Sequence, residues 1–181
     1  PASYGTINYG MVNPALDCVF GFYSRLMVNI SLCNHFISSV NNGEFNLDEA
    51  GKERSLEYIR QARVLRGACY YYMLSFYDKI PYSDENTPVG AEPEQKPRAE
   101  VYRIVTTELE QVVADYNDAS KGAKYATPYY GFVGVDVAEA ILMKIYLNGK
   151  VFAGQDNYTE CYRHAKNIID RLGKGGLNNT G

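Results

Sequence analysis

The sequence of 181 residues has no tryptophan, only two histidines and no dense block of lysine or arginine. Its net charge is −3 at pH 7. Because proteins that bind nucleic acid usually present a strongly basic face, this charge balance argues against a nucleic-acid partner. No uninterrupted apolar run approaches the roughly 18 residues that a membrane-spanning helix needs. The sequence therefore predicts no transmembrane segment.

Motifs that carry catalytic or metal chemistry are also missing. His35 and His164 lie far apart, and neither has a Cys, Asp or Glu at a metal-ligand spacing, so we expect no metal site and no cofactor. No GxSxG, HExxH or glycine-rich phosphate loop occurs. The four cysteines form no CxxC pair and lie among apolar residues, so we interpret them as small buried side chains. They are Cys18, Cys33, Cys69 and Cys161.

Charged residues are most simply explained as surface groups. Three carboxylate pairs fall in expected loops or at a helix start, where solvent and the helix dipole stabilise them. These pairs are Asp84/Glu85, Glu92/Glu94 and Asp136/Glu139. Arg60, Arg63 and Arg66 recur every three residues, and pairing with neighbouring carboxylates is favoured over a patch for an acidic partner. A glycosidase would need two carboxylates at a fixed separation in a cleft, which the sequence alone leaves open.

Tyrosine is abundant, with 17 residues, and three of them are adjacent in the stretch ARVLRGACYYYMLSFYDKIPY. Such a cluster can be a stacking platform for a sugar or a base, or the core of a helical protein. Successive helical residues point about 100° apart, so Tyr70, Tyr71 and Tyr72 cannot share one helix face. We therefore favour packing against different neighbours, with Gly67 allowing one neighbour to come close.

The spacing of apolar residues predicts five helices and no convincing strand. They cover about residues 14–40, 47–77, 99–116, 135–148 and 158–172. Two segments between them, residues 78–98 and 117–131, contain most of the prolines and are interpreted as long loops. The fold class is therefore all-α.

The last two helices follow the order of a tetratricopeptide repeat. Leu142 and Tyr146 supply bulky positions on the first helix, and Cys161 and Ala165 supply small ones on the second. The usual repeat has a tight turn, whereas residues 148–157 insert roughly six extra residues by that template. We predict a tetratricopeptide-like array of about five helices, arranged as helical hairpins with long loops.

Several tyrosines lie outside the predicted helices, where core packing does not account for them automatically. Rings on loops can stack against the apolar face of a sugar while nearby Asn and Asp bind its hydroxyls. An alternative is that these rings hold the loops against the core. The candidates are Tyr4, Tyr9, Tyr82, Tyr125, Tyr129 and Tyr130, of which Tyr82, Tyr125, Tyr129 and Tyr130 are the predicted ligand-binding residues.

The segment QARVLRGACYYYMLSFYDKIPYS, residues 61–83, resembles the signature of the SusD/RagB family. In that family a helix reads approximately E-A-R-F-L-R-A-x-x-Y-F-x-L and ends in G-x-V/I-P. The glutamate is Gln61 here, the phenylalanine is Val64, and Lys79 replaces the glycine before Ile-Pro. The segments FYSRLMVNISLCNHFI, RAEVYRIVTTELEQVVADY and VAEAILMKIYLNGKVF also resemble family helices, in the family's order.

The resemblance implies an outer-membrane, cell-surface lipoprotein that captures an oligo- or polysaccharide for a TonB-dependent, SusC-like transporter and has no catalytic activity. Family members are much longer, so residues 1–181 correspond to the N-terminal helical domain, a fragment of a longer chain. None of the four cysteines matches the lipidation position, so membrane attachment would be through a lipid anchor absent from this chain.

Two other functions remain open at the level of the sequence. A general tetratricopeptide scaffold would bind protein partners in its groove and have no affinity for saccharides. A glycan-degrading enzyme would show turnover that replacement of one carboxylate abolishes.

Overall fold

The computed structural model describes residues 10, 16–118, 120–121 and 133–176. Within these residues the chain forms six helices and one two-stranded antiparallel sheet. In chain order they are α2 (Asp17–Asn41), α3 (Glu49–Phe76), β1 (Lys79–Tyr82), β2 (Glu94–Pro97), α4 (Arg98–Asn117), α5 (Val135–Leu147), α6 (Gly149–Ala153) and α7 (Tyr158–Gly176). The prediction of an all-α, tetratricopeptide-like array is confirmed, and each expected helix lies within a few residues of its predicted bounds.

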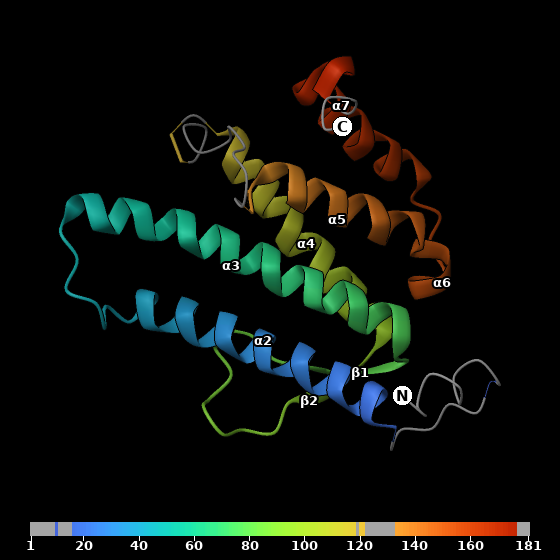
Figure 1. Ribbon diagram of the computed structural model, residues 1–181, viewed down its shortest axis with the longest axis horizontal. Helices are drawn as coiled ribbons and strands as arrows, with labels where there is room; N and C mark the ends of the chain where they lie inside the picture. Colours follow the sequence, from blue (N-terminus) through green and yellow to red (C-terminus); the bar gives the residue numbers. More distant parts are fainter. Residues whose placement is uncertain (1–9, 11–15, 119, 122–132, 177–181) are drawn as a thin grey trace.

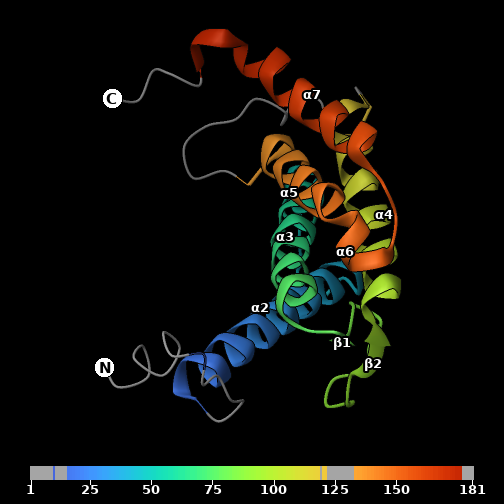
Figure 2. The same ribbon diagram turned by 90° about the vertical axis from the view of Figure 1, so that its right-hand side faces the viewer.

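The long helices form a curved array in which each packs against the next. α2 contacts α3, α3 contacts α4, α4 contacts α5, and α5 contacts α7. Seen from the side, these helices follow an arc from α2 to α7, with β1 and β2 beside the lower end of α4 (Figures 1 and 2). This stacking of neighbouring helices is the arrangement expected of a repeat-like helical protein, in which each unit buries its apolar face against its neighbours.

Local sequence signals explain where α3 begins and ends. Asp48 has an extended backbone, and its carboxylate accepts a hydrogen bond of 2.7 Å from the backbone N–H of Gly51, which caps the helix N-terminus. At the other end Tyr77 returns to an extended conformation directly before β1. The 28 residues between these limits contain no proline. α3 is therefore one continuous helix over these 28 residues.

The three adjacent tyrosines do not share one face, although the rings of Tyr71 and Tyr72 are tilted against each other with centroids 5.3 Å apart. Tyr70 is fully buried and its hydroxyl reaches the backbone of Ser83. Tyr71 lies under the ammonium of Lys144 on α5, 5.9 Å from nitrogen to ring centroid. Tyr72 faces α2 and makes an edge contact with Phe22, although it stays half-exposed. The triplet is therefore a set of packing residues around one helix and not a single stacking surface.

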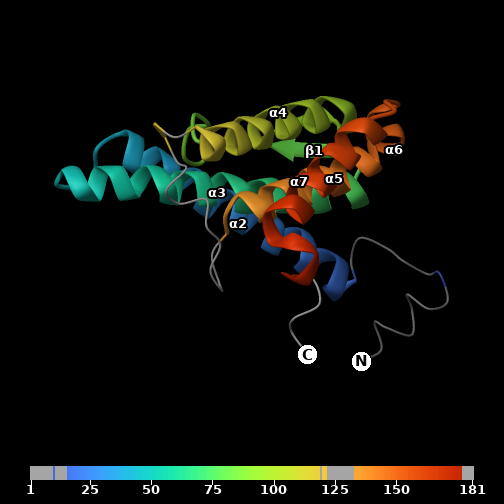
Figure 3. The same cartoon turned by 90° about the horizontal axis from the view of Figure 1, so that it is seen from above.

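α4 is the central element of the core. It packs against α3, α5, α6 and both strands, and Figure 3 shows it on the same side of α3 as β1. Its apolar residues form one face at helical spacing, and Val101, Val105, Leu109 and Val112 are all buried there. Gly67 on α3 lies against Leu109, since a Cβ placed on Gly67 would be 2.8 Å from a Leu109 methyl group. The predicted close approach at Gly67 is confirmed.

The prediction of a wholly irregular loop over residues 78–98 is wrong. Its two ends pair as β1 and β2, with Lys79 opposite Pro97 and Tyr82 opposite Glu94. The prolines obscured this pairing because proline cannot donate a ladder hydrogen bond and is disfavoured inside sheets. In a sheet of two strands each strand has a free edge, so prolines are tolerated there.

The insertion near residue 150 is also more ordered than a loop. It contains α6, a helix of five residues that ends at Gly154 in the left-handed conformation, with φ of 69°. The Oδ1 of Asn157 accepts a hydrogen bond of 2.8 Å from the hydroxyl of Tyr102 on α4. The extra residues thus form a short helix that packs on α4 before α7 begins.

The cysteines differ from their predicted environment. All four are free thiols that are partly exposed and not fully buried. Burial, together with a smaller contribution from nearby Cys33, raises the pKa of the Cys69 thiol to about 11. At neutral pH Cys69 is therefore a protonated, weakly nucleophilic thiol.

Candidate functional site

Tyr82 is the one predicted ligand-binding tyrosine that belongs to the described residues. Tyr125, Tyr129 and Tyr130 lie outside the described residues, as do Tyr4 and Tyr9. Tyr82 is the last residue of β1 and is partly buried. Its ring stacks on Tyr70 with centroids 5.2 Å apart. Tyr82 therefore contributes to packing between the hairpin and α3, whatever else it contacts.

Tyr70 fixes the chain immediately after β1. Its hydroxyl donates to the carbonyl of Ser83 at 2.8 Å and accepts from the N–H of Ser83 at 2.9 Å. Burial raises the pKa of Tyr70 to about 12, so the hydroxyl stays protonated and can make both bonds at neutral pH. The Ser83 hydroxyl in turn accepts a bond of 3.1 Å from the side-chain amide of Asn34 on α2. Ser83, directly after β1, is thus hydrogen-bonded to both α2 and α3.

Arg66 lies at the centre of a buried ionic cluster beside this segment. Its side chain is only 2% exposed. One guanidinium nitrogen donates to the side-chain Oδ1 of Asn34 and to Glu85, each at 2.6 Å, and the other donates to Glu108 on α4. Arg63 reinforces the cluster, with a nitrogen 3.4 Å from Glu85. We call Arg63, Arg66, Glu85 and Glu108 the Arg66 cluster.

The charges of the Arg66 cluster stabilise one another. Burial alone would raise the pKa of Glu85, but a hydrogen bond from its own backbone and the charge of Arg66 hold that pKa below its usual value. Burial would lower the pKa of Arg66, yet Glu108 and Glu85 keep it above the usual range. Arg66 and Glu85 are therefore both charged at neutral pH and attract each other.

The arginines thus pair as predicted, but one of the carboxylates is not where the sequence suggested. Glu85 was expected on a solvated loop, and its side chain is largely buried against Arg66. Arg60, the third member of the series, pairs at 3.1 Å with Glu57, which also accepts a bond of 2.7 Å from Tyr116. The Arg60 pair lies within α3, whereas Arg66 pairs with Glu85 after β1 and with Glu108 on α4, so these arginines form internal ion pairs and not a patch for an acidic partner.

A second buried polar cluster joins α7 to α4 and α5. His164 on α7 is fully buried, with Nε2 at 2.9 Å from Glu110 and Nδ1 at 3.4 Å from Glu139. Its ring stacks on Tyr146, with centroids 5.7 Å apart. Glu139 also binds Asn167 at 2.7 Å and Arg171. We call His164, Glu110 and Glu139, with the groups that bind them, the His164 cluster.

The sequence analysis missed the His164 cluster, and one of its expectations is wrong here. Glu139 was expected to be solvated, but it is completely buried and lies beside His164. The available signal was a glutamate within the apolar pattern VAEAIL, because a buried charge needs a partner. Among the described residues, no group of three His, Cys, Asp or Glu side chains is arranged to hold a metal ion. His35, by contrast, is exposed on α2.

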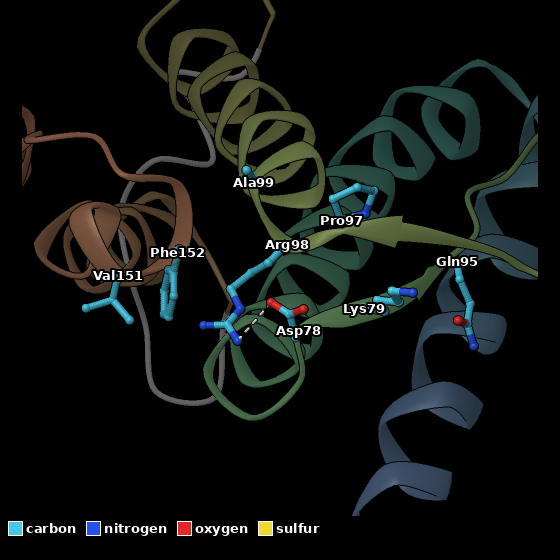
Figure 4. Close-up of a pocket in the computed structure, with 8 residues that line it drawn as sticks. All are labelled: Asp78, Lys79, Gln95, Pro97, Arg98, Ala99, Val151 and Phe152. Carbon is cyan, nitrogen blue, oxygen red and sulfur yellow. Dashed lines mark hydrogen bonds and ion pairs between the residues drawn. The ribbon is translucent and has the colours of Figure 1, made fainter.

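An open cavity of about 540 Å³ lies between the hairpin and α6. Figure 4 shows Arg98 in its middle, with Val151 and Phe152 on the α6 side and Lys79 and Gln95 on the hairpin side. Its lining residues are Asp78, Lys79, Gln95, Pro97, Arg98, Ala99, Val151 and Phe152. We call it the hairpin cavity. Its volume is within the range of small-ligand sites, roughly 300–1,000 Å³.

Among the described residues, no helix is both long enough and apolar enough to cross a membrane. The helical array instead has an exposed apolar edge. On α3, residues spaced by seven and four, namely Tyr58, Leu65, Tyr72 and Phe76, are exposed on one side. Phe22 on α2 joins them through edge contacts with Tyr72 and Phe76, at centroid separations of 5.9 and 5.5 Å. We call these five residues the aromatic edge.

No protein-family model matches the chain. It is 27% identical to the starch-binding protein SusD of Bacteroides thetaiotaomicron over 152 residues, which cover 81% of this chain and 24% of SusD. The chain is thus similar to SusD along most of its own length. The SusD-like chain therefore spans about a quarter of the length of that curated relative.

A solved structure shares the fold. Surface glycan-binding protein A from Bacteroides uniformis superposes with a TM-score of 0.61 at 20% sequence identity. The match covers 83% of the SusD-like chain and 31% of that protein. The correspondence therefore includes most of the helical array described above.

Proposed function

We propose that this protein is a non-catalytic glycan-capture module of a bacterial outer-membrane uptake system. The observation that carries the proposal is the similarity to SusD, a starch-binding protein, along 81% of the chain. The shared fold with a surface glycan-binding protein supports it. The ionic clusters agree with a scaffold role, since their charges are used in joining helices and hairpin.

Residues 1–181 would form the N-terminal helical domain of a longer SusD-like chain. The aromatic edge supports this proposal, because monomeric proteins seldom leave contiguous large apolar side chains in solvent. Phe76 is 66% exposed and lies beside Tyr72 and Phe22. We propose that other protein covers this edge, either the remainder of the chain or a TonB-dependent, SusC-like transporter. The protein would be held at the outer cell surface by a lipid anchor outside this sequence.

Tyr82, Tyr125, Tyr129 and Tyr130 remain the proposed glycan contacts. Burial raises the pKa of the Tyr82 hydroxyl above its usual value, and Glu108 raises it further, so the group is a neutral donor at physiological pH. Tyr82→Phe keeps the ring stacked on Tyr70 and removes only the hydroxyl. If that hydroxyl binds a sugar, the variant keeps its stability and binds glycan several-fold more weakly.

Calorimetry of the full-length protein with a panel of polysaccharides, run beside a reducing-sugar assay, tests the function. Binding heat without release of reducing ends is the expected result. Release that is abolished by replacing one carboxylate would make the protein a glycosidase. No heat with any glycan, together with binding of peptides, would instead favour a general protein-binding scaffold, for which the aromatic edge is the available surface.

A further inference from the structure

The hairpin cavity has one wall made by a single face of the two-stranded sheet. Lys79 is opposite Pro97 in the ladder, and both line the cavity together with Gln95, two residues from Pro97. Alternate residues of a strand point to opposite faces. Ile80 and Tyr82 therefore point the other way, and Ile80 is fully buried in the core. The hairpin cavity is thus a different surface from the one that Tyr82 occupies.

Arg98 supplies the central polar group of this cavity and is held by two contacts. Its Nε donates to the carbonyl of Tyr77 at 3.1 Å, and one terminal nitrogen, Nη2, lies 3.5 Å from the Asp78 carboxylate. The other terminal nitrogen, Nη1, has no hydrogen-bond partner among the described residues. A guanidinium fixed on one side with donors free on the other is suited to receive an anionic oxygen.

The charge of the cavity is positive once internal pairing is considered. Asp78 is the one carboxylate among the lining residues, and its charge is balanced by Arg98. Lys79 is exposed and has no ion-pair partner in the part of the chain that the structure describes. The Gln95 side chain is exposed beside it. The cavity therefore offers one net positive charge, the donors of Lys79 and Arg98, and an amide that both donates and accepts.

The opposite wall is apolar and comes from the insertion that lengthens the helical hairpin. Val151 on α6 is 70% exposed although it is aliphatic, and Phe152 beside it anchors α6 in the core. Pro97 adds another apolar surface. A sugar ring has both an apolar face and a rim of hydroxyl groups, so one apolar wall and one hydrogen-bonding wall match its two kinds of surface.

We propose that the hairpin cavity binds an anionic saccharide, one that carries a carboxylate or a sulfate group. In this arrangement Lys79 and the free nitrogen of Arg98 bind the anionic group, Gln95 binds ring hydroxyls, and Val151 contacts the ring. The assignment rests on the proposed glycan-binding function and specifies a class of glycan and a site for it.

The test is calorimetry of the full-length protein with three probes: an oligogalacturonate, a sulfated galactan oligosaccharide and a neutral maltooligosaccharide. The key variant is Lys79→Gln, because Lys79 is exposed and its replacement leaves the hairpin contacts intact. We expect it to weaken binding of an acidic probe by about tenfold and to leave a neutral probe unaffected, as loss of one charged hydrogen bond predicts. Binding of the carboxylate probe alone, or of the sulfate probe alone, identifies the anionic group.

Arg54→Gln is the matched control. Arg54 is exposed on the second turn of α3, far along the chain from the cavity, and its replacement removes the same unit of charge. If Lys79→Gln and Arg54→Gln lose the same affinity for the acidic probe, the loss reflects the net charge of the protein, and the proposed site is wrong. Binding of neutral probes with no preference for acidic ones would overturn the ligand class while the proposed function stands. If no glycan binds, both proposals are wrong.

Discussion

At the N-terminal end of the array, Arg66 joins α2, α3, α4 and the hairpin through one guanidinium, whereas at the C-terminal end several groups share that task. Glu110 there accepts bonds from Tyr146 at 2.9 Å and Arg163 at 2.7 Å, in addition to its contact with His164. Glu139 likewise has Asn167 and Arg171 besides His164. The Arg66 cluster depends mainly on one residue, since Arg63 contacts the same carboxylates only at 3.4 and 3.7 Å, whereas each carboxylate of the His164 cluster has several close partners.

The difference follows from what each cluster must position. The Arg66 cluster fixes an irregular segment, residues 83–87, whose backbone groups are not bonded within a helix. The His164 cluster fixes α7, a helix that already satisfies its own backbone and needs only side-chain contacts. Loss of the central residue should therefore have unequal effects at the two ends.

Arg66→Met should produce the largest loss of stability. It leaves Glu85, Glu108 and Asn34 without their main donor, and removal of one partner from a buried ionic cluster costs about 3–5 kcal/mol in the free energy of unfolding. Urea denaturation followed by circular dichroism measures the change. Arg54→Met is the control for the same substitution on the exposed side of α3, where we expect less than about 0.5 kcal/mol. Equal losses in the two variants would contradict a special role for Arg66.

His164→Ala should cost less, about 1–3 kcal/mol, although His164 is just as buried. The remaining donors on Glu110 and Glu139 keep both carboxylates bonded, so the main loss is the ring that packs on Tyr146. Hydrogen exchange should show the change in α7 and leave α2 and α3 protected. A loss as large as that of Arg66→Met would mean that the other donors do not compensate, and the comparison between the ends would fail.

The helices at both ends were predictable because their apolar residues repeat at helical spacing. The pattern Val101, Val105, Leu109 and Val112 gives α4 its buried face, and the same reasoning separated Tyr70, Tyr71 and Tyr72. The cap of α3 is equally local, because the Asp48 carboxylate accepts from the N–H of Gly51 three residues later. These features depend on neighbours along the chain.

The hairpin and the two clusters were not predictable because they depend on residues far apart in the sequence. Pairing of Ile80 with Lys96 has no local signal once prolines suggest a loop. Glu85 looks like a solvated loop carboxylate until the fold brings Arg66 beside it, and Glu139 looks like helix-dipole compensation until α7 covers it. The hairpin cavity likewise exists only because α6 packs near β1 and β2.

Gly149→Ala tests how tightly the start of α6 packs against its neighbours at the C-terminal end of the array. A Cβ on Gly149 would lie 2.9 Å from the carbonyl of Gln155 and 3.0 Å from the Tyr102 hydroxyl, so backbone must move. We expect a loss of about 1–3 kcal/mol in the free energy of unfolding, as for overpacking of a tight core. The control is Gly21→Ala on α2, where a Cβ meets no atom within 4 Å and helix propensity should raise stability slightly. An unchanged free energy of unfolding in Gly149→Ala would indicate that the start of α6 is loosely packed.

The smallest expected effect is on the pH dependence of the free energy of unfolding. One partly buried carboxyl contributes to it at each end of the array, Glu85 at the N-terminal end and Glu110 at the C-terminal end. The pKa values of Glu85 and Glu110 are both held below the ordinary value of 4.5 in the folded protein, despite burial, which acts to raise them. For Glu85 the opposing contributions are a backbone hydrogen bond and Arg66, and for Glu110 they are hydrogen bonds from His164 and Tyr146. A carboxyl with a depressed pKa in the folded state stabilises the protein above its unfolded pKa, and this contribution is lost as pH falls through the folded value.

Stability should therefore decline as the pH drops below about 4.5, with one contribution from each end. Glu85→Gln should be less stable at neutral pH and should lose less on acidification, since it removes the contribution of the N-terminal end alone. Urea denaturation at successive pH values measures the slopes, and Glu110→Gln gives the corresponding result for the C-terminal end. A parent-like slope in Glu85→Gln would show that its contact with Arg66 does not stabilise the ionised form, which would remove the electrostatic basis of the Arg66 cluster.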